Sequence, residues 1–364
     1  MPDTNTSGLY RSIHAQPDAI RELLIDWDGP SRAAEMMAQA GRIFLSGIGT
    51  SFHAASVGEY LLRFAGADAW AVRSFEFVHY PRPLRADDGV IVVSHRGSKI
   101  HGNLAVQRAL SSGVRTVGIT GRDSKMQGEL LVIQTVAQEI SSAHTISYTG
   151  GLTRLAQIAA RLAALNGRTR EAQVLEQGLA HLPSIMEDIL AGEDGVREIA
   201  NDAVANNRRL FYIGAGPNAV TGPEGALKAK EAAYVTAEGF ELEQAIHGPQ
   251  VGFERQDLVI PVCVHGAAQS RIADLLLALQ EIGSHVWLVG LAPTEETAAL
   301  IDGDRWKLFA IGYNVDLPEE LTPLLTVIPL QLLADFLATA RGTNADSFRA
   351  DQEAYKNAGL RFKL

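Results

Sequence analysis

The stretch RIFLSGIGTS, residues 42–51, is an unbroken apolar run that ends in glycines and hydroxyl side chains. The residues that follow, SFHAASVGEYLLRFAG, have the apolar spacing of a helix. A buried strand, a glycine-rich turn and a helix, in this order, form the unit from which parallel α/β sheets are built. This stretch therefore predicts an α/β fold.

The same layout occurs a second time along the chain. After RIFLSGIGTS, the segments ADAWAVRS, DGVIVVSH and VRTVGITG are predicted strands that alternate with helices. A helical stretch is expected around residues 152–205. RRLFYIGAGPN then repeats the first layout, and DLVIPVCVH and HVWLVGL follow as strands. We interpret this order as an internal duplication of one α/β domain. A last helix is predicted over LLTVIPLQLLADFLATARG, with Gly342 as its stop.

Length and composition narrow the classes of function. The chain has 364 residues, which suggests two domains, and 46% of them are hydrophobic. The formal net charge of -10 disfavours nucleic acid and anionic membrane surfaces as partners. Cys263 is the single cysteine, so no internal disulfide can form. The first residues do not read as a signal peptide, and no unbroken apolar run reaches the about 18 residues of a membrane span. We expect a cytoplasmic protein.

Three polar loops follow predicted strands of the first half. Glycines at a strand-to-helix turn let backbone N–H groups approach an anion, and ligands bind at the carboxyl ends of parallel strands. The loops therefore predict a cradle for a phosphate or a carboxylate. They do not match the dinucleotide or P-loop signatures, and no cofactor or metal is expected. The candidate substrate-binding residues are Gly49, Thr50, Ser51, Ser94, His95, Arg96, Ser98, Lys99 and Ser142. In the third loop, EISSAHT, helix capping by serine or threonine is the alternative interpretation.

A charged stripe lies on the predicted helix EGALKAKEAAY. Glu224, Lys228 and Glu231 have the spacing i, i+4, i+7 and share one helix face, while most of the remaining positions are apolar. This pattern is typical of a helix that lines a cleft. Intrahelical ion pairs are the alternative interpretation. Downstream, His247 precedes Gly248 and Pro249; taken alone, such a histidine is more often structural or exposed than catalytic.

Together these segments resemble the isomerase half of the glutamine–fructose-6-phosphate aminotransferases, a family with two sugar isomerase (SIS) domains. The resemblance covers residues 10–349 and rests on IHAQPDAI, GIGTS, EGALKAKEAAY, HGP and IPLQLLA. It implies two tandem SIS domains, each a parallel five-stranded sheet flanked by helices in a flavodoxin-like three-layer sandwich. We divide the chain into a helical segment over 1–40, first and second SIS domains over 41–185 and 195–342, and a tail over 343–364. The tail is polar but holds Tyr355, Leu360 and Phe362, so we expect it to dock at the active site.

The resemblance also implies roles for individual residues. Thr50 and Ser51 match the first phosphate-binding loop, and Ser94 matches the start of the second. Glu231 matches the carboxylate that moves a proton between C1 and C2 of a phosphosugar, and Glu224 and Lys228 match residues that organise that site. His247 matches a ring-opening histidine supplied by the neighbouring subunit, which implies a homodimer. This chemistry suits the residue types, since a carboxylate can shuttle a proton through an enediol and a lysine can offset the oxyanion.

The sequence departs from the family in three places. No counterpart of the glutaminase half is found, so glutamine-dependent amination is not expected. The second loop reads SHRGSK, where Arg96 and Lys99 replace hydroxyl residues and add positive charge. The lysine that forms an imine in the aminotransferases has no direct counterpart, and Lys356 is the nearest candidate.

These observations leave several hypotheses for function. The leading one is an isomerase or deaminase acting on a ketose or amino-sugar phosphate. The first alternative is a deglycase for a phosphorylated fructosamine, with Arg96 and Lys99 binding a second acidic group. A sugar-phosphate sensor without turnover is an alternative of another class. A dinucleotide oxidoreductase is the weakest alternative, because the fingerprint is missing.

Overall fold

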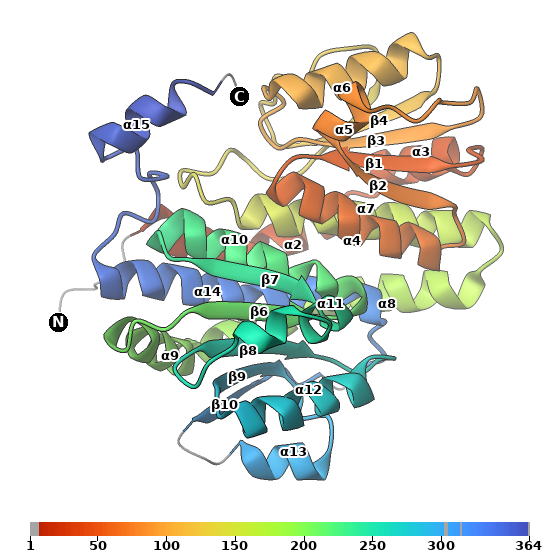
Figure 1. Cartoon of the computed structure of the whole chain (residues 1–364). Coiled ribbons are helices and arrows are strands. Elements are labelled where there is room, and N and C mark those ends of the chain that lie inside the picture. The colour runs from red at the N-terminus through yellow and green to blue at the C-terminus, as the bar shows by residue number, and fades with distance from the viewer. Residues whose placement is uncertain (1–6, 302–304, 314, 363–364) are drawn as a thin grey trace.

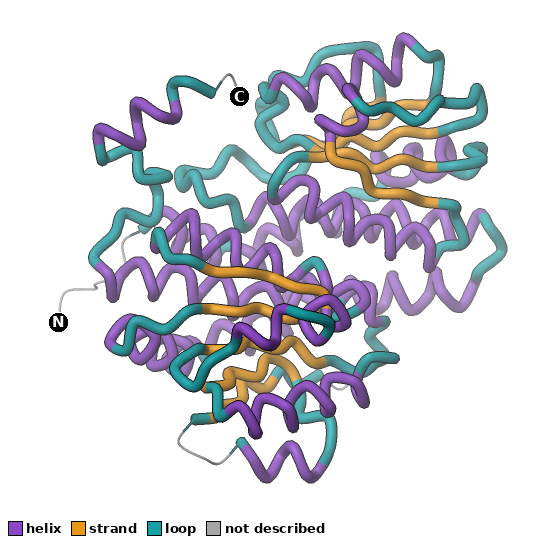
Figure 2. Tube along the Cα trace, in the orientation of Figure 1, coloured by secondary structure: helices purple, strands orange, loops and turns teal. Residues whose placement is uncertain are grey.

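The structure is a computed structural model that describes residues 7–301, 305–313 and 315–362. It contains two parallel sheets of five strands (Figures 1 and 2). The strands of the first sheet are β1 (Ile43–Gly47), β2 (Ala69–Arg73), β3 (Gly89–Val93), β4 (Arg115–Thr120) and β5 (Leu131–Gln134). Their order is β2-β1-β3-β4-β5, so the chain reverses its direction of travel across the sheet between β1 and β3. In such sheets this switch point is where ligands bind.

The second sheet repeats this topology. Its strands are β6 (Leu210–Gly214), β7 (Ala237–Glu241), β8 (Leu258–Cys263), β9 (His285–Gly290) and β10 (Trp306–Ala310). The order β10-β9-β8-β6-β7 is the order of the first sheet read from the other edge, and all pairs are parallel. The duplication and the predicted fold class, two parallel five-stranded sheets flanked by helices, are confirmed.

Helices cover the sheets and join them. In the first half they are α1 (Gly8–His14), α2 (Gln16–Ile25), α3 (Asp28–Met37), α4 (Thr50–Phe64), α5 (Ser74–His79), α6 (Ile100–Ser111) and α7 (Ile146–Leu165). The later ones are α8 (Thr169–Ala191), α9 (Glu193–Ala205), α10 (Thr221–Ala233), α11 (Leu242–Ile246), α12 (Gln269–Ile282), α13 (Glu295–Leu300), α14 (Pro323–Arg341) and α15 (Glu353–Gly359). Within the described residues, three short 3₁₀ turns complete the elements, η1 (Gly216–Ala219), η2 (Pro249–Gly252) and η3 (Glu319–Leu321).

The last predicted helix is confirmed as α14. Pro323 occupies its first turn, where the missing N–H costs nothing, and Gly342 ends it with a φ of 66°. By length and hydropathy, residues 319–341 could cross a membrane, with a mean hydropathy of 1.7. The tested window is wholly buried inside the protein, so this helix belongs to the core.

One apolar cluster joins the two halves. It contains Leu45 of the first sheet, Leu210 of the second and Leu330 of α14, all fully or almost fully buried. α10 and α14 lie between the sheets in Figure 1 and pack against each other. A Cβ on Gly225 of α10 would lie 2.8 Å from the Leu330 side chain, so the helices approach closely. The two sheets are therefore fixed relative to each other. The predicted domain boundaries stay predictions.

Candidate active site

The first polar loop connects β1 to α4. A Cβ on Gly47 would lie 2.3 Å from the carbonyl oxygen of Ser51, and Gly49 has a φ of 55°. Both positions therefore need glycine, because any side chain would clash or strain the backbone. The helix begins at Thr50 and no side chain caps it. Its N-terminus, with the hydroxyls of Thr50 and Ser51, is suited to bind an anion.

The second polar loop follows β3. Ser94 is buried, whereas Arg96 and Ser98 are exposed. Burial, and then the charge of Arg96, lowers the pKa of Lys99. Burial also lowers the pKa of His95 to about 4, so this ring is neutral at pH 7. The loop therefore presents two cations and one uncharged imidazole.

The third polar loop, residues 139–145, is held by a carboxylate. Glu139 accepts hydrogen bonds from the backbone N–H of Thr145, at 2.9 and 3.1 Å, and from that of Ser147, at 2.9 Å. Burial alone would raise the pKa of Glu139, but hydrogen bonds from His144, Ser147 and Thr145 lower it to about 2. Thr145 makes no side-chain cap at the start of α7. Glu139, rather than a serine or threonine, thus satisfies the start of this helix.

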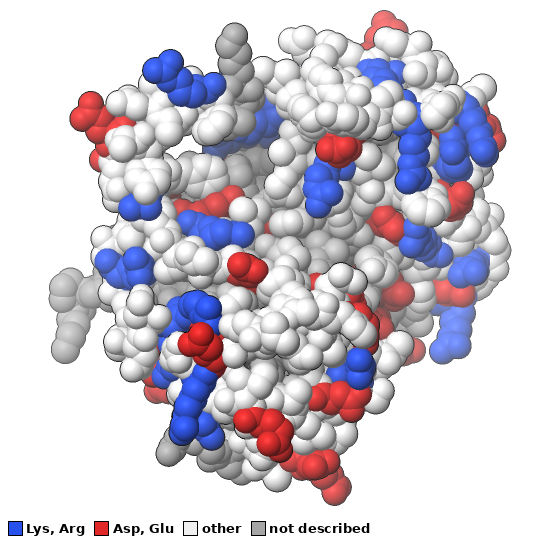
Figure 3. Space-filling model, in the orientation of Figure 1, with Lys and Arg blue, Asp and Glu red and all other residues white. Residues whose placement is uncertain are grey.

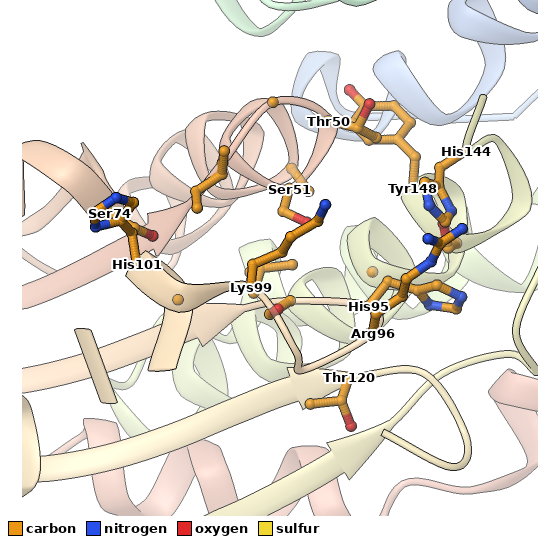
Figure 4. Close-up of a pocket in the computed structure, with 18 of the residues that line it drawn as sticks. Thr50, Ser51, Ser74, His95, Arg96, Lys99, His101, Thr120, His144 and Tyr148 are labelled. Atoms are coloured by element: carbon orange, nitrogen blue, oxygen red, sulfur yellow. The ribbon is translucent and has the colours of Figure 1, made fainter. Parts of the chain in front are cut away.

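A cavity of about 850 Å³ opens at the carboxyl ends of the first sheet (Figure 4). All three loops contribute to its wall, as the parallel-sheet argument predicts. Of the predicted binding residues, those that line it are Gly49, Thr50, Ser51, Ser94, His95, Arg96, Lys99 and Ser142. Ser98 is not among the lining residues. In Figure 4, His95, Arg96 and His144 gather on one side of the cavity, and Ser74 and His101 lie on the other.

Helix α10 brings a carboxylate from the second half of the chain to this cavity. Glu231 lines the cavity, and burial raises its pKa against the opposing effect of Lys228. Lys228 contacts Glu231 directly and lies 3.5 Å from Glu224. Its side chain is 1% exposed. The ion pairs expected from the helical spacing are therefore present. Of the stripe, Glu231 lines the cavity, whereas Glu224 and Lys228 are buried and do not line it.

Glu224 joins α10 to the first loop. Its side chain is fully buried, accepts a hydrogen bond from Thr50 Oγ1 at 3.1 Å, and lies 2.5 Å from His53 Nδ1. Burial alone would raise the pKa of Glu224, but Lys228 and His53 lower it. Burial alone would lower the pKa of Lys228, but Glu224 and Glu231 raise it, so Lys228 stays protonated. Glu224 is thus a charged link between the two halves, behind the cavity wall.

Two of the predicted catalytic residues lie elsewhere in the single chain. The His247 side chain is 72% exposed, and its Nε2 lies 3.2 Å from a carboxylate oxygen of Glu243. Lys356 is exposed on α15. Neither lines the cavity. The placement of His247 in the site of a neighbouring subunit, and imine formation by Lys356, stay predictions.

The structure adds cavity residues that sequence patterns did not single out. They are Ser74, His101, Thr120, Thr135, Ser147, Tyr148, Phe348 and Arg361, with several apolar side chains. Phe348, Arg361 and Phe362 belong to the tail that was predicted to dock at the active site. The aromatic side chains of that polar segment were its one sequence signal, and nothing pointed to Arg361. His144, noted in the third loop, also lines the cavity.

The SIS domain family model matches residues 36–164, the part of the chain that carries the three loops. Residues 36–164 form a SIS domain. This span contains the whole first sheet, from Ile43 to Gln134, and most of the cavity wall. Because the second sheet has the same strand order, the chain contains two SIS-type units.

Known proteins resemble the chain over both of its halves. Over 355 residues the chain is 34% identical to a glutamine–fructose-6-phosphate aminotransferase of Gloeobacter violaceus; the match covers 94% of this chain and 57% of that protein. The chain thus spans little more than half the length of this relative. The C-terminal domain of glucosamine-fructose-6-phosphate aminotransferase from Francisella tularensis has a similar structure, with a TM-score of 0.84 and 19% identity, covering 94% of this chain and 98% of that one.

Tagatose-6-phosphate ketose/aldose isomerase from Escherichia coli has a similar fold. The TM-score is 0.78 at 18% identity, and the match covers 94% of this chain and 95% of that chain. At this identity the likeness concerns the fold alone. The resemblance to the isomerase half of the aminotransferases is confirmed.

Proposed function

We propose that this chain is an enzyme that moves a proton between C1 and C2 of a sugar phosphate, with Glu231 as the base. The observation that carries the proposal is the position of Glu231. It comes from α10 of the second half but lines the same cavity as Thr50, Ser51 and Ser94 of the first. A phosphate held at the start of α4 would leave the sugar carbons inside the cavity, within the space that Glu231 borders.

The electrostatics of α10 suit proton transfer. Burial raises the pKa of Glu231, and a base with a pKa closer to neutrality is a better match for a proton beside a carbonyl. Lys228 stays protonated next to it, so positive charge is available to offset an enediolate. Ketose–aldose isomerisation and deamination of an amino-sugar phosphate both begin with this step.

The test is solvent deuterium exchange. The protein is incubated in D2O with fructose 6-phosphate, glucose 6-phosphate, glucosamine 6-phosphate and tagatose 6-phosphate, and deuterium at C1 or C2 is measured by mass spectrometry. Glu231→Gln keeps the size of the side chain but cannot accept the proton, so exchange should fall about 10²–10⁴-fold. Glu198→Gln, an exposed glutamate on α9, is the matched control. Full exchange by Glu231→Gln would refute this role of Glu231. A sensor would bind one of these compounds without any exchange in the wild-type protein.

A second candidate function is favoured by the cations of the cavity. Arg96, Lys99 and Arg361 all line it, more positive charge than one phosphate needs. A phosphorylated fructosamine of an amino acid carries a carboxylate as well as the phosphate, so a deglycase would use this charge.

Two substrates separate this candidate from the first. A phosphorylated fructosamine made from an amino acid is compared with one made from a neutral amine of similar size. The deglycase proposal predicts that Arg96→Ala with Lys99→Ala weakens only the amino-acid adduct. Unchanged affinity for both compounds in the double variant would overturn it.

A further inference from the structure

A carboxylate–imidazole pair lies in the cavity wall opposite the side that holds Ser74 and His101. It consists of Glu139 and His144, with 3.4 Å between Glu139 Oε1 and His144 Nδ1. The hydroxyl of Ser147 is 3.3 Å from the same ring nitrogen. With Nδ1 engaged by these two oxygens, Nε2 is the nitrogen available to a ligand. A buried carboxylate that orients an imidazole in this way is the arrangement used for general acid–base catalysis.

The pair is rigidly mounted. The carboxylate of Glu139 is 1% exposed and accepts the N–H groups on either side of the start of α7. The neighbouring Ser142 N–H donates to the carbonyl oxygen of Asp346 at 3.0 Å, so the segment after α14 also pins this loop. A side chain on such a support keeps its orientation toward the cavity without help from a ligand.

His144 lies in the same cavity as Glu231, the proposed base. Glu231 and His144 both line the cavity. His95 lies beside His144, with 5.3 Å between ring centroids and an edge-to-face contact. Both ring nitrogens of His95 are buried and lack a hydrogen-bond partner among the described residues. His95 is therefore an uncharged ring packed beside His144.

A metal ion is the rival use of these side chains. His95, Glu139 and His144 offer one ligand atom each, and these atoms lie within 4.8 Å of one another. However, both oxygens of Glu139 already accept backbone hydrogen bonds, and Arg96 and Lys99 line the same cavity. Nearby positive charge opposes a cation and favours an anionic ligand. We therefore favour acid–base chemistry at this position.

We propose that His144, positioned by Glu139, opens the cyclic form of the sugar phosphate within a single subunit. Nε2 takes the proton of the anomeric hydroxyl as the carbonyl forms and the ring C–O bond breaks. The imidazolium then returns that proton to the former ring oxygen, so no atom or electron is gained or lost. The inference rests on the proposed function, and it assigns to His144 the task that the resemblance gives to His247 of a neighbouring subunit.

The test separates ring opening from proton transfer at carbon. In a Glu231→Gln background the carbon-bound proton cannot be shuttled, but ring opening still interconverts the α and β anomers. Anomer exchange of fructose 6-phosphate and glucosamine 6-phosphate is measured by NMR exchange spectroscopy. Adding His144→Gln should lower the enzyme-catalysed exchange about a hundredfold or more, because glutamine cannot carry the proton. Adding His181→Gln, an exposed histidine on α8, is the matched control and should change nothing.

Glu139 is tested as a positioning residue. Glu139→Gln should lower kcat for anomer exchange about tenfold, with KM unchanged, because the amide still fills the space but no longer stabilises the imidazolium. If Glu139→Gln instead lowered thermal stability and substrate binding but left kcat unchanged, Glu139 would have a structural role only.

Several outcomes would overturn the proposal. One is anomer exchange that survives His144→Gln; another is exchange that is lost in His247→Gln but not in His144→Gln. Loss of exchange on treatment with EDTA would favour the metal instead. Failure of the proposed function has a different signature, namely deuterium exchange at carbon that persists in Glu231→Gln.

Discussion

The two halves of the chain build their first strand-to-helix turn on the same backbone. A Cβ on Gly47 would lie 2.3 Å from a backbone carbonyl oxygen, and a Cβ on Gly214 would lie 1.9 Å from one. Two residues later, Gly49 and Gly216 have φ values of 55° and 54°. Duplication has therefore preserved a backbone that can approach an anion in both halves.

The two turns differ in what lies next to them, an open cavity in the first half and packed side chains in the second. In the first half the turn borders the cavity of about 850 Å³. In the second half Asn218 is buried, donates to Thr322 Oγ1 at 2.8 Å, and accepts from Thr221 at 3.0 Å and Thr326 at 2.6 Å. Next to it lies a void of about 10 Å³, bordered by Cys263. The first half leaves a cavity above its turn, whereas the second half fills the equivalent position with its own side chains and supplies Glu231 of α10 to the cavity wall instead.

The largest expected effect concerns the buried ion pairs of α10, which we expect to stabilise the contact between the two halves. Lys228→Met leaves Glu224 and Glu231 without their buried counter-charge, so it should cost about 3–5 kcal/mol in the free energy of unfolding. Lys230→Met, an exposed lysine two residues away, should stay within about 0.5 kcal/mol. Both are measured by urea unfolding. Equal stability of the two variants would show that the stripe is not a structural link between the halves.

The next test compares the two turns directly. Asn218→Ala removes the acceptor of two buried hydroxyls and should cost about 2 kcal/mol or more, with fructose 6-phosphate binding unchanged. Ser51→Ala should leave stability within about 0.5 kcal/mol but weaken binding about tenfold, by loss of a hydrogen bond to the phosphate. Unfolding and calorimetric titration provide the two readouts. If Asn218→Ala weakened binding and Ser51→Ala lowered stability, the proposed roles of the two turns would be wrong.

A smaller effect concerns acid stability. The pKa of His95 is lowered to about 4 in the folded chain and is near 6.5 when unfolded. Between these values the unfolded state binds more protons, so His95 makes stability fall as pH falls from 6.5 to 4. His95→Gln should flatten this fall by about 1–2 kcal/mol between pH 7 and 5.

The second half offers the matched histidine. Burial, and then the charge of Arg208, also lowers the pKa of His285, but less strongly than that of His95. His285→Gln should therefore flatten the pH dependence less than His95→Gln does. Urea unfolding at several pH values checks both variants, and a larger effect at His285 would contradict the assignment.

The smallest effect is expected at Lys356. This lysine is exposed on α15 and does not line the cavity, so Lys356→Ala should change turnover by less than about twofold. Borohydride reduction in the presence of fructose 6-phosphate should give no adduct at this residue, by peptide mass spectrometry. An adduct at Lys356 would support the imine chemistry predicted from the family and would mean that α15 moves toward the cavity.

Much of the fold could be predicted from sequence because central strands are continuous apolar runs. β1, β3 and β8 are buried along their whole length. The strands β5, β7 and β10 were not singled out, since each lies at a sheet edge and has few buried residues. The segment SIHAQPDAIRELLIDW contains the end of α1 and the whole of α2, with Pro17 in the first turn of α2.

The net charge of the chain did not predict the charge of the cavity. The net charge of -10 describes the whole surface, and Figure 3 shows positive and negative side chains interspersed over one face. It does not describe the cavity, where Arg96, Lys99 and Arg361 come together. Arg361 is more than 250 residues from the other two cations, and no local pattern connects them.

The sequence by itself determined the duplicated α/β units, the glycine turn at residues 47–51 and the single charged face of α10, because these follow from local periodicity and backbone conformation. Only the tertiary structure decided that one turn opens on a cavity while its repeat is filled by Asn218. Likewise it placed His144 against Glu139 and Glu231 beside the loops of the other half. Such features depend on which side chains meet after the two sheets pack around α10 and α14. These residues are far apart along the chain, so no local sequence pattern predicts that they will be in contact.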